Sequence, residues 1–186
     1  MKKSTKIEIP EPKLSVLLFQ DTRMSFIWLI VRIYIGWQWF IAGFDKIQNP
    51  LWVGGKAGTA IHGFLLNALN KSSGPHPDVQ SWYAVFIKDF ALPNSVLFSY
   101  VVSFGELLVG LALIVGLFTG IAAFFGAYMN INYLLAGTVS TNPVLFVLAL
   151  LLILAWRVAG WWGIDRFLLP LLGTPWAPGK LFKHKR

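Results

Sequence analysis

The stretch MSFIWLIVRIYIGWQWFIAGF, residues 24–44, contains 21 residues, of which only Arg32 is charged. Three further stretches of 18 to 24 residues are similarly apolar: 94–117, 120–137 and 143–162. An α-helix rises about 1.5 Å per residue, so about 20 residues cross the ~30 Å hydrocarbon core of a bilayer. The sequence therefore predicts an all-α fold, an integral membrane four-helix transmembrane bundle.

Composition indicates the same class of protein. Apolar residues make up 56% of the 186 and charged residues 13%, and the mean hydropathy is +0.62. These values are too apolar for a soluble domain. We therefore expect a single membrane domain, residues 1–186, in contact with the lipid bilayer.

Lysine and arginine are distributed unevenly around the predicted spans. Residues 1–23 and 163–186 hold five each, and the short link between the third and fourth spans holds none. Basic residues collect on the cytoplasmic side of membrane proteins, so both termini are predicted inside and the loop 45–93 outside. The net charge of +8 is then explained by basic residues that set the orientation in the membrane and contact anionic lipid head groups. A nucleic-acid partner is not expected, because the basic residues form no separate domain.

Residue types exclude several redox centres. The chain has no cysteine, and its histidines, His62, His76 and His184, lie outside the predicted spans. Iron–sulfur clusters and cysteine zinc sites are therefore excluded within this chain, and haem is not expected. We expect no metal site, so any redox role requires a diffusible cofactor or a partner subunit.

The outer loop 45–93 is too long for a plain connection and contains two amphipathic patterns. In the first, Ile61, Phe64, Leu65 and Ala68 share one face. In the second, an aromatic face comprises Val79, Trp82, Tyr83, Phe86 and Phe90. Both patterns predict interfacial helices that cover the outer end of the bundle, as a simple lid or as a gate for substrate.

Each predicted span carries one polar group at a similar depth, counted from its cytoplasmic end. These groups are Arg32, Glu106, Asn130 and Arg157, and Tyr133 shares the helix face of Asn130. An ionisable residue inside a span is costly and marks a functional site when a partner is available. We therefore predict that Arg32 pairs with Glu106 and that Asn130 satisfies leftover donors or acceptors.

The pairing leaves three interpretations open. It is a structural ion pair, a ligand site in which Arg32 or Asn130 holds a carbonyl or an anion, or a route for proton transfer through Glu106. Arg157 is a weaker member of the set, because its side chain can extend to the inner head groups.

Nine tryptophans are present. Amphipathic indole rings concentrate at membrane interfaces, and we expect such positions for Trp28, Trp161, Trp162 and Trp176. Trp39 lies deeper and on the helix face of Arg32. It offers a flat surface to a ring-shaped ligand such as a quinone.

Several of these residues stand in motifs that resemble the DoxX family. The match begins with Arg32, Gly36 and the run Phe40-Ile-Ala-Gly43-Phe-Asp-Lys46. It continues through Gly74-Pro-His-Pro-Asp-Val-Gln-Ser-Trp82-Tyr, Gly105-Glu106-Leu-Leu-Val-Gly110, Asn130-Ile-Asn132-Tyr-Leu-Leu-Ala-Gly137-Thr-Val-Ser-Thr-Asn-Pro143, and Ala155-Trp-Arg157-Val-Ala-Gly160 to Gly163-Ile-Asp165-Arg166. Together these motifs cover about residues 25–172.

The resemblance implies a four-helix protein of the prokaryotic cytoplasmic membrane. One branch of the family is DoxD-like and resembles the membrane subunit of thiosulfate:quinone oxidoreductase, which passes electrons from thiosulfate to a membrane quinone. Other relatives resemble membrane anchors of oxidative-stress complexes with superoxide dismutase and sulfurtransferase partners.

Two functions follow as hypotheses, and the chain holds no self-sufficient catalytic motif for either. In the first, the protein is the quinone-facing subunit of a membrane oxidoreductase, with Glu106 relaying protons beside the head group. The candidate ligand-binding residues are Arg32, Trp39, Glu106, Asn130 and Arg157. In the second, it is a non-catalytic subunit that anchors or stabilises a larger complex of membrane or peripheral proteins. A solute channel is disfavoured because no span carries a continuous polar stripe.

Overall fold

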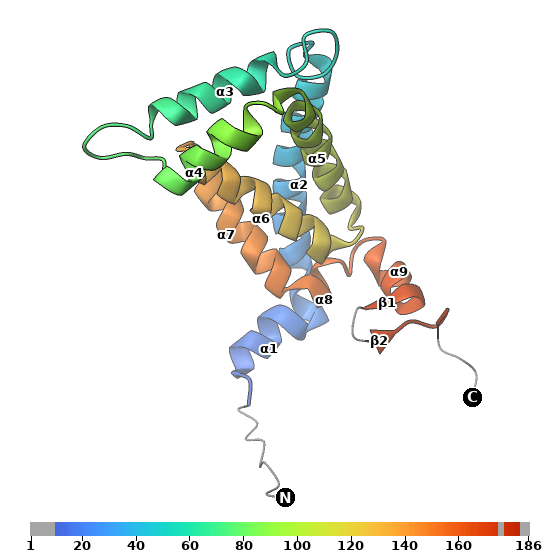
Figure 1. The fold of residues 1–186 in the computed structure, drawn as a ribbon. Helices are drawn as coiled ribbons and strands as arrows, with labels where there is room; N and C mark the ends of the chain where they lie inside the picture. The colour runs from blue at the N-terminus through green and yellow to red at the C-terminus, as the bar shows by residue number, and fades with distance from the viewer. Residues whose placement is uncertain (1–9, 175–176, 183–186) are drawn as a thin grey trace, which may run out of the picture.

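The structure, a computed structural model, describes residues 10–174 and 177–182 (Figure 1). Helices dominate it, and a two-residue strand pair follows the last one. The elements in chain order are α1 (Lys13–Gln20), a 3-10 turn η1 (Thr22–Met24), α2 (Ser25–Gln48), α3 (Thr59–Asn70), α4 (Ser81–Phe86), a π-helical turn η2 (Ile87–Ala91), α5 (Ser95–Val115), α6 (Thr119–Leu135), α7 (Asn142–Leu154), α8 (Trp156–Ala159), α9 (Asp165–Leu172), β1 (Gly173–Thr174) and β2 (Ala177–Pro178). The all-α prediction is confirmed.

Two helical segments are long and apolar enough to cross a membrane. They are Thr22–Gln48, with 27 residues, and Ser95–Val115, with 21. The other two predicted spans are shorter as continuous helices, because α6 has 17 residues and α7 has 13. The fourth span is interrupted at Ala155, beyond which the four-residue helix α8 follows.

The two long helices, α2 and α5, run antiparallel and touch along most of their length. Glycines allow their backbones to approach closely, as small residues do between membrane helices. A Cβ atom at position 43 would collide with the backbone of Leu107, and one at position 110 would collide with the backbone of Phe40. α5 also packs on α6, α6 on α7, and α7 on α2. A buried apolar cluster fills the interior between them, including Ile35, Trp39, Leu113, Ala123 and Leu152.

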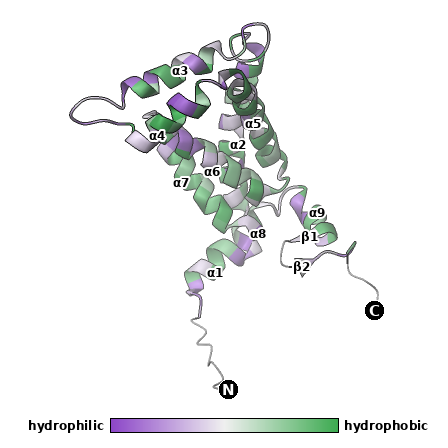
Figure 2. Ribbon diagram, viewed as in Figure 1, coloured by the Kyte–Doolittle hydropathy of each residue, from purple (hydrophilic) through white to green (hydrophobic). Residues whose placement is uncertain are grey.

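The outward faces of these helices are apolar, whereas polar side chains are buried. Leu108, Ile121 and Val144 are each more than half exposed. Ser103, Glu106 and Asn130 are instead almost fully buried. Figure 2 shows the hydrophobic character of α5, α6 and α7. This inversion of the usual soluble pattern fits a surface covered by lipid.

The predicted amphipathic helices of the outer loop are present as α3, α4 and η2. α3 contacts α5 and η2 at the end of the molecule that we call the outer end (Figure 1), and it buries Ile61, Leu65 and Ala68. The predicted inward face of the second helix is correct only in part. Val79 and Tyr83 are buried, but Trp82 and Phe90 are 61% and 53% exposed. The buried positions recur every four residues, through Ile87 and Ala91. Trp82 and Phe90 therefore point away from the core, whereas Phe86 is partly buried and packs against it.

The described parts of both terminal segments lie at the opposite end from α3 (Figure 1). There α1 packs on α8, and Trp28 is buried: it stacks on Phe19 and donates to the Leu18 carbonyl at 2.6 Å. Trp162 at the same end is 57% exposed. The predicted interfacial Trp176 and the basic residues before position 10 and after position 182 lie outside the described residues.

Candidate functional site

The predicted pair between Arg32 and Glu106 is wrong. Gly43 of α2 faces Glu106 and Leu107, whereas Gly36 faces Leu113 and Ile114. In this register Arg32 is 11 positions before Gly43, or about 16 Å along the helix. The prediction placed the cytoplasmic ends of the two spans level with one another. In the structure the N-terminal part of α2 extends beyond the C-terminal end of α5. Arg32 and Glu106 therefore lie at different depths and belong to separate clusters.

Glu106 is 1% exposed and both of its carboxylate oxygens accept hydrogen bonds from side chains. Lys46 Nζ donates to Oε2 at 2.6 Å, and the Tyr133 hydroxyl donates to Oε1 at 2.5 Å. The lysine side chain is 20% exposed and also lies over the ring of Trp52, 5.2 Å from its centroid. Three elements, α2, α5 and α6, thus meet at one carboxyl group. We call Lys46, Glu106 and Tyr133 the outer triad.

A cavity of about 330 Å³ adjoins the outer triad. Trp39, Trp52, Phe64 and Leu145 contribute apolar or aromatic walls, and the exposed Ser140 and Thr141 lie at its edge. The Trp39 ring stacks on Tyr133 with centroids 6.4 Å apart, and Phe64 meets the same tyrosine edge-on at 5.9 Å. Apolar walls with a few convergent polar groups are typical of a small-molecule site.

One donor on the wall of this cavity has no partner. Trp39 is 3% exposed, and its indole Nε1–H makes no hydrogen bond. A buried unpaired donor costs about 1–3 kcal/mol, and native structures rarely leave one without an explanation. The nitrogen lies beside Gly126 of α6, where a Cβ atom would be 3.0 Å from it.

Asn130 is a second buried group without partners. It is 0% exposed, and neither its amide nitrogen nor its oxygen makes a hydrogen bond. It lies one turn before Tyr133 on the inward face of α6. The predicted contact of Asn130 with an Arg32–Glu106 pair is therefore absent, and its two polar atoms remain available.

Arg32 belongs to the inner end of the molecule. Its guanidinium donates from Nη1 to the Ala159 carbonyl and from Nη2 to the Trp162 carbonyl, both at 3.0 Å. It packs against Gly116 and Gly163 so closely that a Cβ at either position would overlap it. Arg32 thus binds α2 to the carbonyls that end α8, a favourable place for a cation.

Asp165 lies in the same inner region. It accepts the backbone N–H of Phe118 at 2.6 Å and that of Thr119 at 2.7 Å. Its own N–H donates to the Gly116 carbonyl at 2.9 Å. Asp165 therefore caps the N-terminus of α6 from a distant part of the chain. We call Arg32 and Asp165 the inner knot.

Arg157 joins neither cluster. Its side chain is exposed and lies over the ring of Trp156, 5.6 Å from the centroid. The predicted layer of four polar groups at one depth is therefore wrong. Of the five predicted ligand-binding residues, the structure brings Trp39 and Glu106 together on one cavity and places Arg32 and Arg157 elsewhere.

A further polar contact holds the outer helices. The Tyr83 hydroxyl donates to the side-chain oxygen of Asn132 at 3.0 Å, and Lys71 Nζ donates to the Gly137 carbonyl at 2.7 Å. Burial, and to a lesser degree Tyr128, raises the pKa of Tyr83 to about 12. The phenol therefore stays neutral and able to donate at ordinary pH.

Comparison with known proteins supplies the family. The family model that matches is DoxX, over residues 27–139. This chain belongs to the DoxX family. No curated protein and no solved structure matched it. DoxX proteins are membrane proteins, so the apolar outward-facing sides of the helices described above are in contact with the lipid bilayer.

The DoxX match contains the whole outer triad, together with Trp39 and Asn130, but not Asp165. Lys46 escaped the sequence prediction because it follows Asp45 at the apparent end of the first span and was assigned to the loop. α2 in fact continues to Gln48. The signal for Tyr133 was present, since it shares a helix face with Asn130.

Proposed function

We propose that this protein crosses the membrane four times and binds a quinone beside the outer triad, as a subunit of a quinone-linked oxidoreductase. Packing supports the two shorter crossings: α6 lies against α5, and α7 against α2 and α6. The 17 residues of α6 span about 25 Å, enough for most of a hydrocarbon core. Basic residues such as Lys13, Arg23 and Arg166 lie at the end near the termini, which supports a cytoplasmic location for that end.

The unpaired Trp39 Nε1–H is the observation that carries the quinone proposal. Trp39 lines the cavity of the outer triad, and a quinone that entered beside its indole edge would offer two carbonyl acceptors on a flat ring. Trp39, Trp52 and Phe64 supply the aromatic surface for such a ring. A bound quinone would accept two electrons and two protons to become a quinol.

The residues of the outer triad are suited to move those protons. The Tyr133 hydroxyl donates a hydrogen bond to Glu106 Oε1, and the Lys46 ammonium group donates one to Oε2. Lys46 is partly exposed and Glu106 is not, so the lysine connects the carboxylate with water at the outer surface. Electrons would come from a diffusible cofactor or a partner subunit, because this chain has no cysteine.

Binding of a quinone can be tested with the protein in nanodiscs. Decylubiquinone is titrated, and its binding is followed by quenching of tryptophan fluorescence and by equilibrium dialysis. We expect Trp39→Phe to weaken binding about tenfold or more, since one buried hydrogen bond is lost. Trp37→Phe is the matched control, because Trp37 is 55% exposed toward lipid. Equal affinity in the two variants would contradict the proposal.

The alternative of a non-catalytic anchor subunit is supported by a different observation. Trp82, Val85 and Phe90 on α4 and η2 are each more than half exposed, a surface that fits docking of another membrane subunit. Under this alternative, Trp82→Ser would remove proteins that co-purify with the chain from its native membrane. Absence of bound quinone, together with such a loss, would favour the anchor.

A further inference from the structure

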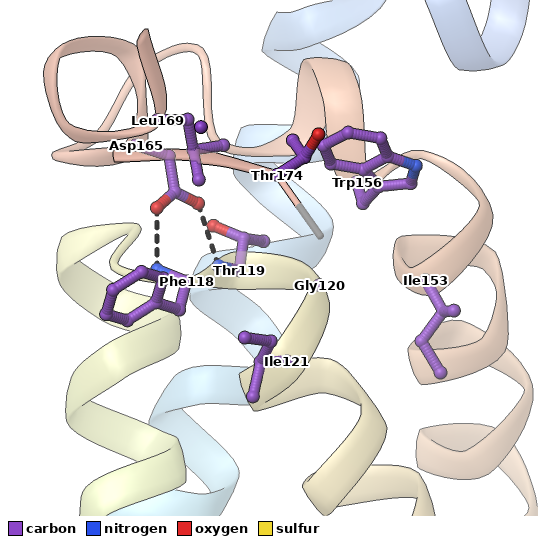
Figure 3. Close-up of a pocket in the computed structure, with 10 residues that line it drawn as sticks. Phe118, Thr119, Gly120, Ile121, Ile153, Trp156, Asp165, Leu169 and Thr174 are labelled. Atoms are coloured by element: carbon purple, nitrogen blue, oxygen red, sulfur yellow. Dashed lines mark hydrogen bonds between the residues drawn. The ribbon is translucent and has the colours of Figure 1, made fainter. Parts of the chain in front are cut away.

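A second cavity, of about 280 Å³, lies at the inner end of the molecule, remote from the outer triad. It is a groove between the start of α6, the end of α7 and the segment that contains α9 and β1 (Figure 3). Its walls are mainly apolar, with Ile121, Ile153, Trp156 and Leu169 as the principal contributors. Ile121 is 57% exposed, so the groove borders the lipid-facing surface.

Two residues that line this groove carry a hydroxyl group with no hydrogen-bond partner among the described residues. Thr119 is 0% exposed, and its Oγ1 makes no hydrogen bond. Thr174 Oγ1 is likewise buried and unpaired. Asp165 also lines the groove, but its carboxylate oxygens already accept the backbone N–H groups of Phe118 and Thr119, as Figure 3 shows. The two hydroxyls are therefore free to donate to an acceptor on a ligand.

The surroundings of the groove carry positive charge and apolar side chains. The exposed Arg157 lies over Trp156, whose ring forms part of the wall. Arg166 follows Asp165 and is also exposed. On α9, Phe167 and Leu171 are 70% and 42% exposed. An exposed apolar face beside cations is typical of a helix at the surface of a membrane.

We propose that this groove binds an anionic phospholipid, with one acyl chain between Ile121, Ile153 and Leu169. The hydroxyls of Thr119 and Thr174 donate to ester carbonyl oxygens, which lie at the depth where chain and head group join. Arg157 pairs with the phosphate. This assignment satisfies both unpaired hydroxyls, fills an apolar space and matches the charge at its edge. It is independent of the quinone proposal, since no residue of the outer triad takes part.

Native mass spectrometry of the full chain tests the assignment. The protein is delipidated in detergent and mixed with equal amounts of phosphatidylglycerol and phosphatidylcholine that carry the same acyl chains. We expect one retained phosphatidylglycerol, preferred about fivefold over phosphatidylcholine, because the choline cation of phosphatidylcholine offsets the charge of its phosphate and is repelled by Arg157. No retained lipid, or equal retention of both lipids, would overturn the proposal.

Variants distinguish the binding site of the acyl chain from that of the head group. Ile153→Trp should fill the groove and abolish retention, whereas Leu154→Trp, at a lipid-facing position 59% exposed, should retain the lipid. Arg157→Gln should keep the chain bound but remove the preference for phosphatidylglycerol, and Lys56→Gln at the outer end should not. Because Arg157 is exposed, its variant folds even if Ile153→Trp does not. If Arg157→Gln still prefers phosphatidylglycerol over phosphatidylcholine, the proposal that Arg157 pairs with the phosphate is overturned.

Discussion

The outer triad and the inner knot both bury a charged side chain, but they satisfy it in different ways. Glu106 is held by two side chains, Lys46 and Tyr133, and adjoins a cavity. Arg32 is held by two backbone carbonyls at the end of α8, and it lines neither of the two cavities described above. Side chains can exchange protons and partners, whereas backbone carbonyls only accept hydrogen bonds.

This difference separates a functional site from a structural one. Arg32 fixes where α2 sits relative to the turn after α8, and no space remains beside it for a ligand. Arg32 Nε and Trp39 Nε1 are both buried donors without a partner among the described residues, but of the two residues only Trp39 lines a cavity described above. An ionisable residue in a span is therefore not by itself a sign of a ligand site. Whether such a residue marks a ligand site depends on the nature of its partners and on the space around it.

The largest expected effect is on stability, from Arg32→Met. Removal of the guanidinium leaves the Ala159 and Trp162 carbonyls unpaired in the interior, which should cost about 4 kcal/mol of unfolding free energy. Arg157→Met, at an exposed position, should change it by about 0.5 kcal/mol or less. Titration with dodecyl sulfate in mixed micelles measures both. If the two variants unfold at the same fraction of dodecyl sulfate, the inner knot does not stabilise the fold.

The ion pair of the outer triad should respond asymmetrically to loss of either partner. Lys46→Met leaves a carboxylate buried without its cation and should cost about 3 kcal/mol. Glu106→Gln should cost only about 1–2 kcal/mol, because the partly exposed lysine can turn toward water.

The double variant Lys46→Met/Glu106→Gln provides the decisive comparison. It should be more stable than the sum of the single losses predicts, by about 1 kcal/mol or more. Additive losses in the same unfolding assay would mean that the two side chains do not interact.

Local hydrophobicity was sufficient to predict the helical segments 24–44 and 94–117, because burial in lipid is read directly from composition. It was insufficient for the register between them. That register depends on which glycines meet, and Gly36, Gly43 and Gly110 fix it through contacts between residues distant in the chain. A charge at the end of a hydrophobic run, such as Lys46, was consequently assigned to a loop.

The cap provided by Asp165 illustrates a second kind of limit. Its carboxylate caps the N-terminus of α6 from a position 46 residues further along the chain than Thr119. Nothing in the sequence near Thr119 indicates this contact. Trp39 and Glu106, in contrast, were both singled out from the sequence, and both line one cavity. Glu106 was found because a charged residue in a span is a local signal.

The glycine contacts that set the register offer a third test. Gly110→Ala places a methyl group against the backbone of Phe40 and should cost about 2 kcal/mol by overpacking. Gly105→Ala is the matched control on the same helix, since its nearest neighbour is Met129 Sδ at 3.6 Å, an ordinary contact. We expect no loss of stability for the control. Equal behaviour of the two variants would mean that α2 and α5 do not touch at Gly110.

The smallest expected effect concerns the contact that joins α4 to α6 above the outer triad. Tyr83→Phe removes the hydrogen bond to Asn132 and should cost about 1 kcal/mol. Because the pKa of Tyr83 is raised from 10.0 to about 12, the neutral phenol contributes its full stability below pH 10. That contribution should decline as the pH rises from 10 toward 12, since the unfolded chain ionises first. The difference in unfolding midpoint between wild type and Tyr83→Phe, measured at pH 8 and pH 11, should therefore shrink at the higher pH. A difference that grows with pH would show that the phenol ionises more readily in the folded protein than in the unfolded chain.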